Sequence, residues 1–341
     1  MKELKGYIKG VDLGGWLSQG SYDRKHLESF ITEKDIERIA GWKLDHVRVP
    51  VDYNIFEEDD GTLKDDGIEF VDKAVEWCGK YGLNIVLDLH KTFGFSFYYG
   101  DGEVGFFDSP ELQERFYRLW ERLAQHYGKY SDRVAFELLN EVTNKEYIDK
   151  WNAIARRAIE VIRQYAPDTL IFVGSYWNNS VDALKDLEAP YDDKIVYNFH
   201  CYDPFLFTHQ GATWVVEMPV DFRINYPGDI KEYRTKIAEI GLTDIQDYLD
   251  VPDTGFDKGY FERRFESAVK LCEERGVALY CGEYGVIDNA TPEDTVKWYE
   301  YISESFNRFG IGRAAWSYKE MDFGLSDDRL KEVLPELLKL L

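Results

Sequence analysis

Two glutamates stand at the ends of strand-like segments in this 341-residue chain. Glu141 closes the stretch RVAFELLNE (residues 133–141), and Glu283 closes VALYCGE (residues 277–283). In the first stretch, residues 134–139 are apolar apart from Glu137, which indicates a strand buried on both faces. Chemistry in a parallel α/β barrel takes place at the carboxyl ends of the strands, so we expect the two carboxylates to face each other across the barrel mouth.

Further polar and aromatic side chains stand at the ends of the other predicted strands. They are Arg48, His90, Asn140, His200, Tyr202 and Trp316. A single histidine at such a position is more often a hydrogen-bonded structural residue than a catalyst. The gathering of the whole set at one rim predicts a functional site.

Two carboxylates on either side of a glycosidic bond are the standard equipment for its hydrolysis. One carboxyl group stays protonated and gives its proton to the leaving oxygen, while the other is ionised and attacks the anomeric carbon. Arg48 beside a carboxylate favours the ionised form, and a tyrosine hydroxyl can donate to the same oxygen. Asn140 suits a sugar 2-hydroxyl, and Trp316 offers a flat apolar face to a pyranose ring. These residue types fit an uncharged carbohydrate.

Strand-like and helix-like segments alternate along the chain, which indicates an α/β fold with a parallel sheet. Eight strands are predicted, at residues 7–13, 45–50, 84–90, 133–141, 169–174, 194–200, 277–283 and 311–316. Helices are predicted at residues 35–42, 65–82, 111–127, 148–162, 261–276 and 292–309, and a leucine-rich helix before residue 341. We therefore expect a single (β/α)8 TIM barrel over residues 1–341 rather than a doubly wound open sheet.

The connection after the sixth predicted strand is far longer than the ~2–6 residues that are common in such folds. It contains helical patterns at residues 229–240 and 244–249 and several prolines. We interpret residues 203–259 as a subdomain inserted after the sixth strand, on the face where the strands end. A wall of the substrate site and a subdomain core are equally good interpretations for four of its residues: Phe205, Phe207, His209 and Trp214.

The chain carries 41 Lys and Arg against 64 Asp and Glu, a formal net charge of −23. This acidity argues against nucleic acid and against anionic membrane surfaces as partners. The sequence has no apolar run long enough to span a membrane, and its start, MKELKGYIKG, does not look like a signal peptide. We expect a protein that stays in the cytoplasm as written, or is secreted if a leader has been removed. Cys78 and Cys272 fall on the apolar stripes of predicted helices, which indicates reduced core cysteines.

Six motifs give the chain a resemblance to glycoside hydrolase family 5 that runs nearly from end to end. They are LGGW (13–16), DHVRVP (45–50), FELLNE (136–141), VYNFHCYDPFLFTHQ (196–210), LYCGEYGV (279–286) and AAWSYK (314–319). Within the family, the chain is most similar to bacterial endoglucanases of the CelC type. One position departs locally from the family pattern, because Val142 follows Glu141 where many members have proline. The resemblance implies a (β/α)8 barrel that acts as a retaining glycosidase.

The same resemblance implies the roles of individual residues. Glu141 matches the acid/base of the family and Glu283 its nucleophile. Arg48 and Tyr202 are implied as hydrogen-bond partners of the nucleophile, and His200 as a neighbour of the acid/base. The residues implied to line the sugar subsite at the cleavage point are His90, Asn140 and Trp316. The resemblance implies neither a metal nor a cofactor.

Several other conspicuous residues have structural interpretations. We interpret Glu137 and Asp88 as buried carboxylates that pair with a basic neighbour. Surface or packing roles are expected for three histidines, His26, His46 and His126. Weaker candidates for the site follow predicted strands in loops: Trp16, Tyr98 and Trp177.

Two other classes of function use the same residues. In a metal-dependent barrel enzyme His90 and His200 would be ligands, but the chain has no HxH pair at a strand end, and Arg48 and Trp316 would have no task. A non-catalytic carbohydrate-binding barrel typically lacks one of the two glutamates, and both are present here.

The resemblance favours an endo-β-1,4-glucanase that acts as a monomer on cellulose-type and mixed-linkage β-glucan, either as oligosaccharide or as polysaccharide. β-1,3-Glucanases and β-mannanases have the same catalytic pair and differ in their loops. The sequence therefore leaves the linkage open.

Overall fold

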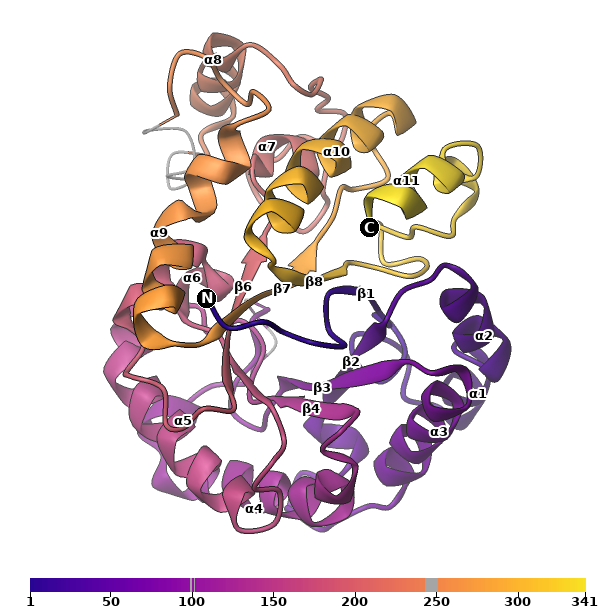
Figure 1. The fold of residues 1–341 in the computed structure, drawn as a ribbon, viewed down its shortest axis with the longest axis vertical. Coiled ribbons are helices and arrows are strands. Elements are labelled where there is room, and N and C mark those ends of the chain that lie inside the picture. Colours follow the sequence, from indigo (N-terminus) through magenta and orange to yellow (C-terminus); the bar gives the residue numbers. More distant parts are fainter. Residues whose placement is uncertain (99, 101, 243–250) are drawn as a thin grey trace.

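Eight parallel strands close into a barrel in chain order, with helices around the outside (Figure 1). The computed structural model describes residues 1–98, 100, 102–242 and 251–341. The strands are β1 (Lys9–Asp12), β2 (His46–Asp52), β3 (Asn84–Lys91), β4 (Val134–Glu137), β5 (Ile171–Val173), β6 (Ile195–Cys201), β7 (Ala278–Tyr284) and β8 (Gly312–Ala315). The predicted (β/α)8 barrel is confirmed.

The helices of the described residues mostly follow the predicted segments. They are α1 (Arg24–Ser29), α2 (Glu33–Gly41), α3 (Asp66–Tyr81), α4 (Pro110–Tyr127), α5 (Ile148–Arg163), α6 (Tyr176–Asn179), α7 (Phe205–Thr208), α8 (Ile230–Ile240), α9 (Tyr260–Arg275), α10 (Pro292–Phe309) and α11 (Leu334–Leu340). Helices α1, α6 and α7 have no counterpart in the prediction, because each is too short to show a helical period.

Helix α10 shows why the sequence forms these elements. Thr291 accepts a hydrogen bond from the backbone of Asp294 and so caps the first turn, where Pro292 provides the fixed φ that suits a helix start. Gly310 ends the helix with a left-handed backbone at φ 68°, which a residue without Cβ adopts without strain. The same signals let the sequence predict this helix with its observed bounds.

The barrel strands divide their side chains between two apolar layers. Ile85 and Leu87 of β3 face the surrounding helices and belong to the main hydrophobic core. Val86, between them, faces inward and packs with Ala135, Phe172 and other residues in a smaller cluster inside the barrel. This alternation follows from the twofold period of a strand, and it fills the barrel below the strand ends.

Strand β4 is shorter than predicted. Its regular pairing ends at Glu137, whereas the prediction continued to residue 141. Only two residues of β4 pair with β5, Phe136 and Glu137. Asn140 is still held at the height of β3, because its N–H donates to the carbonyl of Leu89 at 3.0 Å. Asn140 and Glu141 therefore belong to the loop at the barrel mouth.

The long connection from β6 to α9 contains α7 and α8, and α8 lies outside the ring of barrel helices (Figure 1). Helix α8 confirms the helical pattern at residues 229–240, while the pattern predicted at 244–249 lies outside the described residues. Buried side chains of the connection, among them Phe222, Tyr226 and Tyr233, belong to the same core as the barrel. The division into a barrel and an inserted subdomain at 203–259 stays a prediction.

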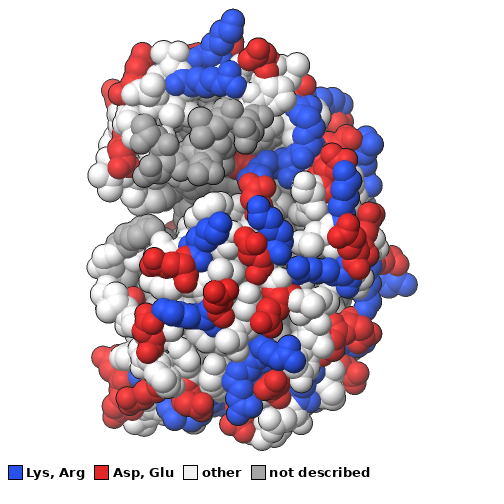
Figure 2. Space-filling view, turned by 90° about the vertical axis from the view of Figure 1, so that its left-hand side faces the viewer, with Lys and Arg blue, Asp and Glu red and all other residues white. Residues whose placement is uncertain are grey.

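The four cysteines are buried and form no disulfide, as expected for reduced core residues. On the face shown in Figure 2, basic and acidic side chains are interspersed. Exposed ion pairs such as those along α5 and α9 agree with this pattern. Within the described part of the chain, none of the helices has both the length and the apolar character needed to cross a membrane.

Candidate active site

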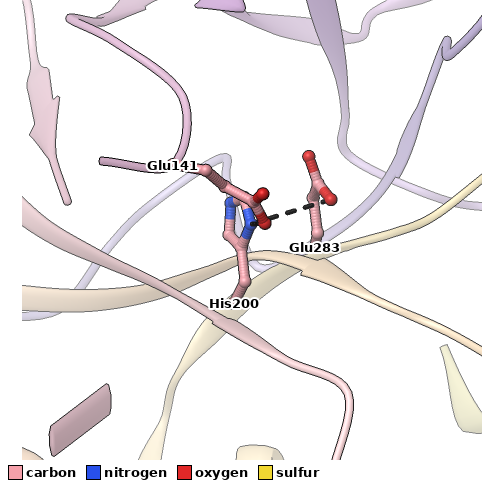
Figure 3. A group of neighbouring side chains, drawn as sticks. All are labelled: Glu141, His200 and Glu283. Carbon is pink, nitrogen blue, oxygen red and sulfur yellow. Dashed lines mark hydrogen bonds and ion pairs between the residues drawn. The ribbon is translucent and has the colours of Figure 1, made fainter. Parts of the chain in front are cut away.

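Glu141 and Glu283 come together at the barrel mouth, with His200 beside them (Figure 3). One oxygen of each carboxylate and one ring nitrogen of His200 all lie within 4.8 Å of one another. His200 Nδ1 is 2.7 Å from Glu141 Oε1 and 3.6 Å from Glu283 Oε2. A shift in the register of β6 and β7 sets His200 directly opposite Glu283. Retaining glycosidases hold their carboxyl groups ~5–5.5 Å apart, and inverting enzymes ~6.5–9.5 Å, so the close pair fits a retaining enzyme.

Glu283 is buried and yet held in its ionised form. Arg48 Nη1 donates to its Oε1 at 2.8 Å, and the hydroxyl of Tyr202 donates to its Oε2 at 2.9 Å. Burial by itself would raise the pKa, but the charges of His200 and Arg48 and the tyrosine hydrogen bond lower the pKa of Glu283 to about 2. This carboxylate is therefore negatively charged at neutral pH and free of protons when a substrate arrives.

Arg48 is fully buried and is shared by carboxylates from several strands. It forms ion pairs with Asp12 at 3.1 Å, Asp88 at 2.9 Å and Glu137 at 2.8 Å, as well as with Glu283. One guanidinium cannot neutralise four carboxylates, and burial raises the pKa of Asp88 to about 7 and that of Glu137 above its ordinary value. Glu137 and Asp88 are thus buried carboxylates paired with a basic neighbour, as predicted.

His90, Asn140 and Trp316 lie at or just beyond the ends of β3, β4 and β8. The rings of His90 and Trp316 are parallel, with their centroids 5.8 Å apart. Asp88 Oδ2 lies 2.6 Å from His90 Nδ1, and burial lowers the pKa of His90 to about 4, so the ring is neutral and held in one orientation. Asn140 Oδ1 accepts from Arg48, while its buried Nδ2 has no partner among the described residues. This leaves the two N–H donors of the amide nitrogen for hydroxyl groups of a ligand.

The aromatic residues at the start of the long connection divide between two tasks. Phe207 packs on Tyr226 within the connection, with ring centroids 5.0 Å apart. Phe205 stacks on His209 at 4.2 Å, and His209 in turn contacts the ring of Tyr202 at 5.0 Å. Trp214 reaches the same group from the solvent side, with its ring 6.1 Å from that of His209. Phe205, His209 and Trp214 are therefore grouped near Tyr202, whereas Phe207 packs within the connection, and the alternatives of site wall and subdomain core stay predictions.

Of the weaker candidates, Trp16 was placed wrongly. It is fully buried, stacks on Trp77 and donates from its indole nitrogen to the carbonyl of Leu27 at 2.9 Å, because the loop after β1 turns it into the core. Tyr98 and Trp177 are exposed at the rim. No sequence pattern indicates Asn178, whose side chain contacts Glu141 from α6.

The three remaining histidines have the packing roles predicted for them. His46 fills the inside of the barrel and contacts the hydroxyl of Tyr280 at 2.7 Å. His26 contacts the carbonyl of Gly15 at 2.7 Å, and His126 contacts Asp72 at 2.8 Å on the surface.

The spacing of Glu141, His200 and Glu283 also meets the basic requirement of a metal site. In a metal site the carboxylate oxygens are free to bind the ion. Here Glu283 already accepts hydrogen bonds from the guanidinium of Arg48, at 2.8 Å, and from the hydroxyl of Tyr202. A cation at Glu283 would lie beside that permanent positive charge. The site is therefore better suited to direct work by its carboxylates than to binding a cation.

Comparison with known proteins agrees with this geometry. The family model described as Cellulase (glycosyl hydrolase family 5) matches residues 15–322. Cellodextrinase A of Ruminococcus flavefaciens is 47% identical over 313 residues, which are 92% of this chain and 86% of that protein. Endoglucanase C of Acetivibrio thermocellus is 38% identical over 340 residues, or 97% of both chains.

Among solved structures, a hyperthermophilic endo-β-1,4-glucanase in complex with substrate shares the fold, with a TM-score of 0.77 at 21% identity over 98% of this chain and 97% of that one. The fold therefore agrees with the family match. The chain belongs to glycosyl hydrolase family 5 and is a glycoside hydrolase that acts on O-glycosyl bonds.

Proposed function

We propose that the protein is a retaining endo-β-1,4-glucanase that hydrolyses cellulose-type and mixed-linkage β-glucans by double displacement. The observation that supports this most directly is the close pair of Glu141 and Glu283, whose nearest oxygens lie within 4.8 Å of each other. That separation leaves no room for a water molecule between a carboxylate and the anomeric carbon, so one carboxylate attacks by itself.

In the first step, the ionised Glu283 attacks the anomeric carbon while Glu141 gives its proton to the departing oxygen. The bond from the anomeric carbon to Glu283 forms as the glycosidic bond breaks, and the proton leaves with the released sugar chain. Arg48 and Tyr202 hold Glu283 in place by one hydrogen bond to each of its oxygens. These bonds orient the nucleophile and keep it unprotonated.

In the second step, Glu141 is ionised and takes a proton from a water molecule, whose oxygen displaces Glu283 from the anomeric carbon. The glycosyl–enzyme bond breaks, and Glu283 returns to its carboxylate form. Glu141 has regained the proton that it lost in the first step. His200 contacts Glu141 in this arrangement at 2.7 Å and fixes the carboxyl group that serves in both steps.

The residues around the pair suit a neutral pyranose. The parallel rings of His90 and Trp316 offer flat surfaces, and the unpartnered Nδ2 of Asn140 is a donor for a sugar hydroxyl. The names of the two relatives, a cellodextrinase and an endoglucanase, favour β-1,4-linked glucose in soluble chains or polymers.

The substrate is tested by measuring reducing ends and product lengths on carboxymethylcellulose, lichenan, laminarin and glucomannan. We expect internal cleavage of carboxymethylcellulose and lichenan, with a range of product lengths from the first minutes. Cleavage of laminarin alone would instead indicate a β-1,3-glucanase, and cleavage of glucomannan alone a β-mannanase.

The roles of the glutamates are tested by Glu283→Gln, which keeps the shape and removes the nucleophile. We expect a loss of activity on the order of 10³-fold or more. The control is Glu217→Gln, an exposed carboxylate of the long connection, which should leave activity unchanged. Full activity of Glu283→Gln would remove the catalytic role proposed for this pair.

A further inference from the structure

The short segment α6, which follows β5, contains an unusual backbone turn next to Glu141, because Trp177 and Asn178 have non-helical backbone angles within it. Trp177, Asn178 and Asn179 all have left-handed backbone conformations, with φ of 51°, 53° and 58°. Residues with a Cβ rarely adopt this region, and a run of three is strained unless surrounding contacts hold it. Asparagine tolerates the region better than most residues, which fits its presence at two of the three positions.

The contacts that hold this turn come from the segment directly after Glu141. The N–H of Trp177 donates to the carbonyl of Thr143, and the N–H of Asn178 donates to the carbonyl of Val142, both at 3.0 Å. Glu141 itself has a left-handed backbone, with φ 36°. The turn and the loop that carries Glu141 therefore form one hydrogen-bonded unit, and strain in each is supported by the other.

The two asparagines of the turn contact both members of the Glu141–His200 pair. Asn178 Nδ2 donates to Glu141 Oε2 at 3.0 Å, while His200 Nδ1 is 2.7 Å from Oε1 of the same carboxylate. Asn179 is fully buried, and its Nδ2 lies 3.4 Å from His200 Nε2. Its Oδ1 has no partner in the described part of the chain, so a rotated amide would accept a proton held by His200 Nε2.

We propose that Asn178 is a positioning residue for Glu141, because its amide holds Oε2 and so fixes the carboxyl group in the orientation that both steps need. An amide N–H can only donate to a carboxyl oxygen, so this contact has one direction. The inference rests on the proposed role of Glu141 as acid/base. It assigns to this chain a residue that reaches Glu141 from α6, whereas His200 reaches it from β6.

Other ionisable groups also act on Glu141 and must be considered with Asn178. His200 and Tyr202 approach from the end of β6, Glu283 from β7, and Asp88 and His90 from β3. On the outer side of the turn, Lys145 Nζ lies 5.7 Å from the centre of the Trp177 ring. Asn178 is uncharged, so replacing it by another neutral residue removes one hydrogen bond and leaves all of these charges in place.

The test uses Asn178→Gly, because glycine adopts the left-handed backbone without strain and lacks the amide. Step one on a cellooligosaccharide needs Glu141 as acid, and step two needs it as base on any substrate. We therefore expect kcat/KM on a cellooligosaccharide and kcat on dinitrophenyl cellobioside, whose second step is slow, both to fall about tenfold. The value of kcat/KM on dinitrophenyl cellobioside should stay unchanged, because its leaving group needs no acid.

Two further variants define the result. Asn178→Asp keeps the shape of the side chain but replaces the amide donor by a carboxylate, so it should lose activity in the same two parameters. Lys43→Gly replaces an exposed residue with the same left-handed backbone, φ 64°, at a remote position and should leave all three parameters unchanged. The inference is overturned if the two parameters stay unchanged in Asn178→Gly, or if kcat/KM on dinitrophenyl cellobioside falls equally.

Glu141→Ala separates this outcome from a failure of the proposed function. If Glu141 is the acid/base, this variant loses far more activity on the cellooligosaccharide than on the dinitrophenyl substrate, and azide accelerates it by attacking the glycosyl–enzyme. If Glu141→Ala behaves in this way while Asn178→Gly keeps wild-type kinetics, only the role of Asn178 fails. Wild-type kinetics of Glu141→Ala would remove the basis of both proposals.

Discussion

Each oxygen of Glu283 has its own hydrogen-bond donor. Arg48 binds Oε1 and Tyr202 binds Oε2, at 2.8 Å and 2.9 Å. Because both donors favour the carboxylate over the acid, a buried side chain remains charged where a lone one would take up a proton. The two donors differ in one useful way, since the hydroxyl of Tyr202 can be removed without leaving an unpaired charge in the core.

Tyr202→Phe removes that hydroxyl and keeps the ring. We expect kcat/KM to fall about tenfold or more, because a hydrogen bond to a charged group contributes about 1.5–3 kcal/mol. The acid limb of the pH–rate profile should move to higher pH, since the ionised form of Glu283 loses a stabilising partner. Initial rates on a cellooligosaccharide across the acid range measure both effects.

Tyr226→Phe is the matched control for this change. The hydroxyl of Tyr226 is buried and has no hydrogen-bond partner among the residues that the structure describes. Its removal should leave the kinetics unchanged and the free energy of unfolding equal or slightly higher, because an unsatisfied polar group leaves the core. An equal loss of activity in both variants would mean that the effect at Tyr202 is not specific to Glu283.

At the scale of elements, β1 and β2 fit together through a glycine and a histidine inside the barrel. Gly10 pairs with His46 across the two strands, and the ring of His46 occupies the space where a side chain of residue 10 would lie. A Cβ on Gly10 would come within 2.3 Å of His46 Nε2. His46 could not retreat without giving up its contact with Tyr280.

Gly10→Ala should therefore destabilise the protein by about 1–3 kcal/mol, the usual effect of overpacking a core. Denaturant unfolding at equilibrium measures the change. Gly41→Ala at the end of α2, where an added Cβ meets nothing within 4 Å, should instead be neutral or stabilise the protein by up to about 1 kcal/mol. Equal stability of Gly10→Ala and the wild type would show that His46 can move within the barrel.

The positions of the barrel strands could be predicted from the sequence, because the apolar pattern of a strand and the turn residues beside it are local features. Strand β4 shows the limit of this approach: the apolar residues of its predicted end continue to Leu139, whereas the ladder stops at Glu137. Apolar residues report burial, and a loop held against β3 by Asn140 is buried as well as a strand is. Burial and strand pairing are separate properties, and residue types indicate only burial.

The strand-end residues of the site were predictable for a related reason, since the topology of a parallel barrel brings strand ends together. Asn178 was not predictable, because its position depends on a left-handed turn that no local pattern indicates. Trp16 was misplaced for the opposite reason: a tryptophan after β1 was expected near the rim, but the loop turns it inward against Trp77. Loop conformation depends on tertiary contacts that residue types do not specify.

At the scale of the whole molecule, acidic charge is in excess both on the surface and in the core. The formal net charge is −23, and on the face shown in Figure 2 acidic side chains are interspersed with basic ones. Inside, the single guanidinium of Arg48 faces Asp12, Asp88, Glu137 and Glu283. The stability of the fold must therefore depend on how many protons the buried carboxylates hold.

Asp88 makes the protein less stable as the pH rises. Burial raises its pKa from 3.8 to about 7, so between those values the folded chain holds a proton that the unfolded chain has released. The free energy of unfolding contributed by this group therefore falls as pH rises through that range. In Asp88→Asn, the free energy of unfolding should fall less between about pH 4 and pH 7 than in the wild type, by about 2–4 kcal/mol. Urea midpoints at a series of pH values measure this difference.

Glu283 acts in the opposite direction at lower pH. Its pKa is lowered to about 2, so its contribution to stability is present above about pH 4.5 and is lost as pH falls towards 2.

The control for Asp88→Asn is Asp59→Asn, an exposed change of the same charge, which should leave the slope of the urea midpoints as it is. If both variants flatten the slope equally, general charge repulsion and not the buried carboxylate sets it.

The ion pairs of Arg48 also bear on when the chain becomes active during synthesis. Its partners come from β1, β3, β4 and β7, and the pair with Glu283 joins residues 235 positions apart in the sequence. A chain emerging from the ribosome holds Arg48 and three of its carboxylates long before Glu283 appears. Glu283, the proposed nucleophile, is thus the last of the four partners to be synthesised, and a nascent or truncated chain that stops before β7 lacks it.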